Sequence, residues 1–157
     1  RGMLRTQALD FSDYTTITMT FWFHMYGKPN SNTGGGTNKM GSLGIAATTN
    51  ASSADSGVQA GTGLGFTSDS AGGVTIVSWT DYEGSSTQSG VRITGTQQAS
   101  GHSTSLATGN YWRKATVDLS NAAGEGTVYL YFVAFTLAAA SSWGSDMAID
   151  NIKIIGS

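Results

Sequence analysis

The chain has 157 residues, which predicts a single domain over residues 1–157, and it carries a net charge of −2 with only 11% charged residues. The eight Lys and Arg residues are dispersed, which argues against a nucleic-acid surface because such a surface needs clustered cations to neutralise phosphates. The lack of cysteine excludes a disulfide framework and a thiolate metal site. The longest apolar run, residues 128–140, is too short to insert across a membrane. Because the chain opens with Arg1 rather than Met, we expect a fragment or a processed product of a larger chain.

Short alternating segments predict a chain made almost entirely of β-strands. A first strand is expected over residues 3–9, and the clearest pattern follows at residues 14–27, YTTITMTFWFHMYG, where apolar and polar side chains alternate with a period of two. The further expected strands are residues 42–49, 64–67, 74–79, 91–94, 111–119, 127–137 and 147–155, with loops at 28–38, 50–63, 81–90 and 97–110. No segment has a helical period. The fold class predicted is all-β, a two-sheet antiparallel jelly-roll sandwich with almost no helix.

The two faces of the long strand differ in kind. One face is apolar and predicts the core, together with inward positions of other strands: Phe21, Phe23, Leu43, Ile45, Val117, Leu130 and Phe132. On the other face, threonines give way to Trp22, His24 and Tyr26 rather than to charged residues. Flat aromatic rings stack on sugars, and Tyr and Trp also anchor protein interfaces. The predicted ligand or partner contacts are Trp22, His24, Tyr26, Trp79, Tyr129 and Tyr131. The alternative is that Trp22, Tyr129 and Tyr131 are buried beneath the long loops.

Side chains with oxygen atoms gather at the edge of the last expected strand. Asp146, Asp150 and Asn151 lie within six residues, and hard cations such as Ca²⁺ take oxygen ligands of this type. The alternative is that Asp146 starts the strand and Asp150 accepts hydrogen bonds from loop backbone. In a regular strand Asp146 and Asp150 would share a face with Ile152, mixing acid with core. We therefore predict a one-residue bulge between Asp146 and Ile152 that turns Asp150 away from the core.

Catalytic patterns are weak, and we predict that the chain is not an enzyme. Asp81 and Glu83 are spaced like carboxylates of a glycosidase, but a third carboxylate is lacking in that spacing and a Gly-Ser turn follows, which favours a solvated loop. His24 has no carboxylate nearby in the sequence, His102 lies in a Ser/Gly loop, and no nucleophile elbow is present.

Three separated blocks resemble the MAM domain, an extracellular adhesion module of the concanavalin-like jelly-roll group. They are FWFHMYG with MGSLGI (residues 21–27 and 40–45), WRKATVDLS (112–120), and VYLYFVAF with SDMAIDNI (128–135 and 145–152). The chain departs from this family in lacking its cysteines and in having no counterpart of its opening C-x-F-E strand before Arg1. The resemblance implies a structural cation between the first and last strands, with Asp150 in its shell, although the glutamate expected from the first strand is missing.

These observations lead to two functional hypotheses. The first is a non-catalytic adhesion or assembly module on a microbial or viral surface, for example a virion decoration, tail or fibre domain, that binds a protein surface or copies of itself. The alternative is a carbohydrate-binding module that uses an aromatic sheet face. Both imply an extracellular, cell-surface or virion location, with no nucleic acid as partner, no membrane insertion, and one structural Ca²⁺ as the only candidate cofactor.

Overall fold

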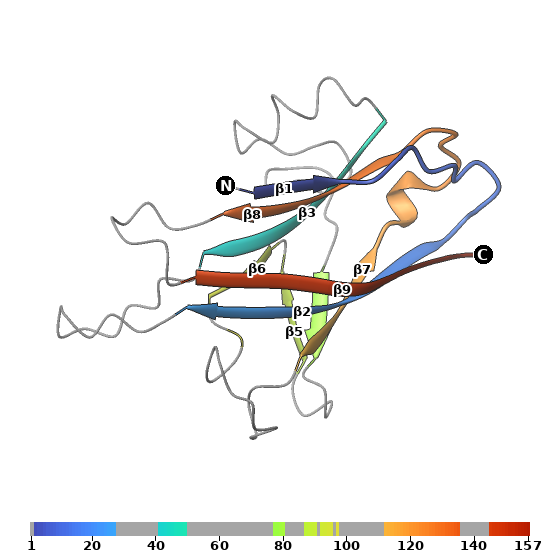
Figure 1. Cartoon of the computed structure of the whole chain (residues 1–157). Coiled ribbons are helices and arrows are strands. Elements are labelled where there is room, and N and C mark those ends of the chain that lie inside the picture. The colour runs from blue at the N-terminus through green and yellow to red at the C-terminus, as the bar shows by residue number, and fades with distance from the viewer. Residues whose placement is uncertain are drawn as a thin grey trace, which may run out of the picture.

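The computed structural model describes residues 2–27, 41–49, 77–80, 87–90, 92–95, 97, 112–135 and 145–157. In this part of the chain two antiparallel sheets pack face to face (Figure 1). The strands are β1 (Gly2–Arg5), β2 (Ile17–Gly27), β3 (Ser42–Thr48), β4 (Val77–Thr80), β5 (Thr87–Gly90), β6 (Arg92–Thr94), β7 (Arg113–Asp118), β8 (Tyr129–Phe135) and β9 (Ser145–Gly156). Within the described residues the one helical element is a 3₁₀ turn, η1, at Ser120–Ala122.

The order of the strands confirms the predicted jelly roll. One sheet runs β1-β8-β3-β6 and the other β5-β4-β7-β2-β9. The pairs β1·β8, β3·β6, β2·β7 and β4·β5 are those that form when one long antiparallel hairpin folds over into two sheets, which is the jelly-roll connectivity. β9 comes after this set of eight and joins the edge of the second sheet beside β2.

The core lies between the sheets and is centred on β2. Residues of β2 alternate strictly between buried and more exposed positions, because successive side chains of a strand point to opposite faces. Every residue predicted for the core is buried: Phe21, Phe23, Leu43, Ile45, Val117, Leu130 and Phe132. Buried side chains from β2 and β7 thus meet those from β3 and β8, so the prediction of the inward faces is confirmed.

The predicted bulge is present in β9. The register of β9 against β2 shifts between Thr20 and Trp22, so that Asn151 and Ile152 together lie opposite a single residue of β2. Asn151 has a positive φ of 50°, a left-handed conformation that Asn tolerates better than most residues. The shift allows Ile149 and Ile154, five residues apart, both to pack against the core, while Asp150 is exposed.

Two expectations about the strands need correction. Thr87–Gly90, placed in a predicted loop, forms β5 and pairs with β4; its sequence, TQSG, has no alternating pattern, so pairing with a neighbour decides its structure. β1 ends at Arg5, and Leu9 instead makes an isolated bridge to Val128. Outside the described residues lie the expected strand at 64–67 and the residues Asp81, Glu83 and His102.

Candidate functional site

Three half-buried side chains form a row on the outer face of the five-stranded sheet. Trp22, His24 and Tyr26 alternate with the core residues of β2, so they point away from the other sheet. The row extends over roughly 14 Å, since each residue of a strand advances about 3.4 Å. The sequence pattern of β2 therefore places these three predicted contact residues together.

A fourth aromatic residue completes this group. Trp112, just before β7, lies beside His24 with ring centroids 5.9 Å apart and ring planes inclined at 53°. Its side chain is 38% exposed, although it is a large apolar group. We call Trp22, His24, Tyr26 and Trp112 the aromatic patch. Trp112 was not among the predicted contacts, but its even number puts it in phase with Lys114 and Thr116, which the alternation of β7 turns away from the core.

Charged residues border the aromatic patch on both sides. Trp22 has Lys114 of β7 as one cross-strand neighbour and Asp150 of β9 as the other. Tyr26 lies opposite Asp146. Directly opposed residues on one face have Cβ atoms about 4.5–5.5 Å apart. The patch thus combines flat rings with carboxylates along one border and an ammonium group on the other.

The environment of His24 keeps its imidazole neutral. Partial burial lowers the pKa of His24 below its ordinary value of 6.5, and the nearby carboxylate of Asp146 opposes this shift. A neutral imidazole offers one N–H donor and one nitrogen acceptor. At pH 7 the centre of the patch is therefore an uncharged polar group between aromatic rings.

The six predicted contact residues do not share one face, and this prediction needs correction. Tyr129 and Tyr131 belong to β8, in the other sheet. Tyr131 is fully buried, as the alternative reading of the sequence proposed, whereas Tyr129 is half-buried beneath the Arg5 guanidinium, 5.7 Å from its ring centre. Position 79 pairs with the buried Ala115 rather than with Lys114, so it is out of phase with Trp22. The alternation of apolar and polar residues within one strand does not reveal which of the two sheets that strand joins.

The acidic residues of β9 do not come together around one ion. Asp146, Ala148 and Asp150 lie on the outer side of the strand, and four residues of strand separate the two carboxylates by roughly 13 Å. Each oxygen ligand of a Ca²⁺ ion lies about 2.3–2.6 Å from it, so two parallel side chains at this separation cannot both bind the same ion. The Asp150 carboxylate accepts a hydrogen bond from the Asn151 backbone N–H at 2.7 Å. Among the described residues, no three His, Cys, Asp or Glu side chains form a metal-binding group. Of the predicted ligands Asp146, Asp150 and Asn151, the last two are adjacent, and a Ca²⁺ ion with Asp150 and Asn151 in its coordination shell stays a prediction.

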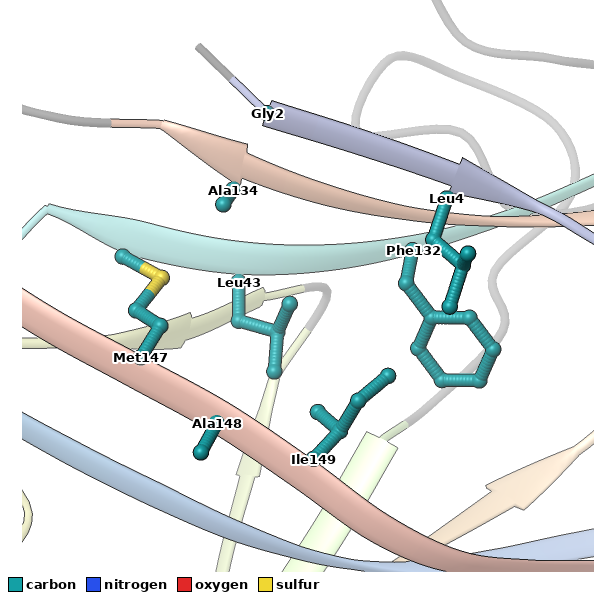
Figure 2. Close-up of a pocket in the computed structure, with 8 residues that line it drawn as sticks. All are labelled: Gly2, Leu4, Leu43, Phe132, Ala134, Met147, Ala148 and Ile149. Carbon is teal, nitrogen blue, oxygen red and sulfur yellow. The ribbon is translucent and has the colours of Figure 1, made fainter.

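An apolar groove opens between the two sheets on the side of β9. It has a volume of about 240 Å³, and Figure 2 shows side chains from β1, β8, β3 and β9 directed into it. Its lining is mainly apolar, and the residues around it are Gly2, Leu4, Leu43, Phe132, Ala134, Met147, Ala148 and Ile149. Leu4 is 55% exposed, so the groove continues the core out to the surface.

No helix in the described ranges has the length and apolar character needed to span a membrane. Comparison with models of known families, with curated proteins and with solved structures gives no match to this chain.

Proposed function

We propose that this chain is a non-catalytic adhesion or assembly module of a microbial or viral surface, for example a virion decoration, tail or fibre domain, and that it binds a partner protein through the aromatic patch. The observation that carries the proposal is the composition of the outer face of β2. A solvent face of an antiparallel sheet is ordinarily polar, whereas here Trp22, His24, Tyr26 and Trp112 adjoin one another.

The physical chemistry of the patch supports a protein partner. Trp and Tyr are enriched among the residues that contribute most to protein interfaces, because they bury a large area while losing little conformational entropy. Trp112 is already held beside His24, so part of the cost of ordering it is met before binding. The patch is smaller than the roughly 800 Å² per partner of a typical interface. We therefore assign it the role of an interface centre, with Asp146, Asp150 and Lys114 in the polar rim.

A second candidate function is carbohydrate binding. It is favoured by the exposed ring of Trp112 next to His24, with the carboxylates of Asp146 and Asp150 along the same face. A ring that stacks on a sugar beside acceptors for its hydroxyl groups is a common arrangement for glycan recognition. This candidate uses the same side chains, so the two functions differ in the partner rather than in the site.

Binding to intact cells separates the two. A fluorescent form of the chain is incubated with a panel of bacterial cells, untreated, treated with protease, or treated with periodate. A protein partner predicts binding that protease removes and periodate leaves intact, and a glycan predicts the reverse. Trp112→Ala and Tyr26→Ala should weaken binding about tenfold or more.

Tyr129→Ala is the matched control, because Tyr129 is a half-buried tyrosine on the outer face of the other sheet. Binding that Tyr129→Ala lowers as much as the two patch variants do would refute the role of the patch. The role of the patch would also be refuted if the chain bound no cell of the panel, or if Trp112→Ala and Tyr26→Ala left its binding unchanged.

A further inference from the structure

The outer edge of β9 is a long, exposed strand edge. β9 has twelve residues, and within the described residues its only strand neighbour is β2 (Figure 1). Its side chains from Asp150 to Lys153 are all exposed, and two isoleucines stand out, with Ile152 at 42% and Ile155 at 54% exposure. An edge of this kind is a template for pairing with another strand.

The bulge at Asn151 and Ile152 determines which pairings this edge accepts. Before the bulge, Ala148 and Asp150 point outward while Ile149 packs on the core; after it, Lys153 and Ile155 are exposed while Ile154 packs on the core. The numbering of the outward positions therefore changes from even to odd. Since paired residues of two strands point to the same face, most registers would place an outward residue opposite an inward one on one side of the bulge.

One antiparallel pairing of β9 with a second β9 avoids this conflict along the whole strand. A two-fold axis between Asn151 and Ile152 sets the two bulges opposite each other. On the outer face, Asp150 then lies opposite Lys153 of the second copy and Ala148 opposite Ile155. On the inner face, Ile149 lies opposite Ile154. Each of these pairs occurs twice because of the symmetry.

We propose that two copies of this chain form a dimer by antiparallel β9–β9 pairing in this register. The two Asp150–Lys153 pairs join opposite charges, and directly opposed like charges would be unfavourable. The Ile155 side chain, exposed in the single chain, gains an apolar neighbour in Ala148. Charged residues and a bulge on an edge strand ordinarily prevent indiscriminate pairing; here they leave one register that is complementary to itself.

The apolar groove adds to the dimer. Met147 and Ile149 of β9 form one side of the groove, and the exposed Leu4 of β1 lies on the other (Figure 2). In the proposed register Ile154 of the second copy extends the inner row next to Ile149, at the mouth of the groove. Apolar area at Leu4 and Ile149 is removed from water when the second copy binds.

The dimer deepens the proposed function, because it names a second copy as one partner of an assembly module. Outward residues pair with outward residues, so the two five-stranded sheets become one continuous sheet. Both aromatic patches then lie on the same side of it. A dimer would engage two copies of a partner at once, which raises the overall affinity without any new contact.

A charge exchange tests the register. Lys153→Asp places a second carboxylate opposite Asp150 at both sites, and Asp150→Lys places a second ammonium group opposite Lys153 at both sites. Each variant alone should raise the dimer Kd, measured by sedimentation velocity, about tenfold or more. In an equimolar mixture, a dimer of one variant with the other has, at each of its two sites, a carboxylate of the Lys153→Asp chain opposite an ammonium group of the Asp150→Lys chain. The mixture should therefore dimerise more tightly than either variant alone. Far-ultraviolet circular dichroism checks that each variant is folded.

Cysteine cross-linking tests the geometry independently, and the parent chain has no cysteine to interfere. The double variant Ala148→Cys/Ile155→Cys puts two cysteines directly opposite each other at both ends of the pairing, with Cα atoms at about 4.5–5.5 Å, within the range of a disulfide. Mild oxidation should yield a covalent dimer. Ala148→Cys alone is the control, because its two copies would be roughly 24 Å apart along the strands and should stay uncross-linked.

The proposal is overturned by a parent chain that remains monomeric at its highest soluble concentration, by a dimer whose Kd neither charge variant changes, or by equal cross-linking of the single and double cysteine variants. The cell-binding assay reports separately on the aromatic patch. Lys153→Asp is the variant to use for this comparison, because Lys153 lies opposite Thr20 and outside the polar rim of the aromatic patch. A Lys153→Asp chain that is monomeric but still binds cells, more weakly, supports both proposals. A dimeric chain with no patch-dependent binding contradicts only the proposed function.

Discussion

The ring of Phe21 in β2 meets the ring of Phe132 in β8 edge to face, with centroids 5.3 Å apart and planes at 89°. The two residues come from opposite sheets, and both are buried. Phe23 lies next to Phe21, at a centroid distance of 6.2 Å. This cluster joins the two layers of the sandwich near their centre. Edge-to-face pairs of this kind contribute about 0.5–1.5 kcal/mol beyond the area that they bury.

Removing a ring of this cluster should strongly destabilise the fold. Phe23→Ala and Phe132→Ala are each expected to lower the free energy of unfolding by about 3–5 kcal/mol, because a cavity remains between sheets that cannot collapse fully. Urea denaturation measures the loss. Phe132→Leu is the milder control, since it keeps most of the volume. Losses under about 1 kcal/mol at both alanine variants would contradict the assignment of the inward face.

Gly156 lies directly beneath the ring of Tyr14, so a side chain at position 156 should be harmful. A Cβ atom added to Gly156 would overlap the Tyr14 ring. Gly156→Ala should therefore cost about 1–3 kcal/mol, as overpacking usually does. In a Tyr14→Ala background the same substitution should cost much less, which a double-mutant cycle measures. Equal costs in the two backgrounds would show that this contact is not the cause.

The positive φ of Asn151 makes a matched pair of variants informative. Asn151 is exposed and has φ of 50°, so its backbone conformation, rather than packing, dominates the effect of a substitution. Asn151→Gly should leave the stability unchanged or raise it slightly, because glycine adopts this conformation readily. Asn151→Val should lower the free energy of unfolding by about 1–2 kcal/mol. Two variants of equal stability would argue against the bulge.

The environment of His24 predicts a pH dependence near neutrality. Partial burial lowers the pKa of His24 in the folded chain below 6.5, and Asp146 only partly offsets this. Between the folded and unfolded pKa values the unfolded chain binds more protons, so stability should fall as the pH decreases through about 6.5 and should level off below the folded pKa. His24→Gln should flatten this part of the profile, as measured by thermal unfolding between pH 8 and pH 5.

The pKa values of Asp10 and Asp118 are lowered chiefly by hydrogen bonds from Ser12 and Ser120, respectively. Their stabilising effects are present above the ordinary value of 3.8 and are lost as the pH falls through the lowered pKa values. The loss of stability that these two carboxylates cause below pH 3.8 should therefore persist in His24→Gln. A parent profile that is flat between pH 8 and pH 5 would contradict the lowered pKa of His24.

The predicted Ca²⁺ site is tested by melting temperature. Calcium at 100 times its dissociation constant stabilises a fold by about 2.7 kcal/mol, which for a chain of this size raises the melting temperature by several degrees. Asp150→Asn should abolish the rise, whereas Asp146→Asn should not, because Asp146 lies roughly four residues of strand away. A melting curve that neither calcium nor a chelator changes would refute the predicted Ca²⁺ site.

The sequence by itself determined the local features of this protein. The strict alternation of β2 assigns Phe21 and Phe23 inward and Trp22, His24 and Tyr26 outward, because a strand has a period of two whatever its neighbours are. The same periodicity required a bulge in β9, since Asp150 and Ile152 could not both face the core.

Only the tertiary structure decided what depends on pairing between distant strands. It placed Tyr131 and Tyr129 in the sheet opposite Trp22, brought Trp112 beside His24, and made a strand of Thr87–Gly90, whose residues carry little pattern of their own. It also left β9 at the end of its sheet, which creates the edge on which the proposed dimer depends. Strand order arises from contacts between segments far apart in the chain, and a local periodicity does not specify which strands become neighbours.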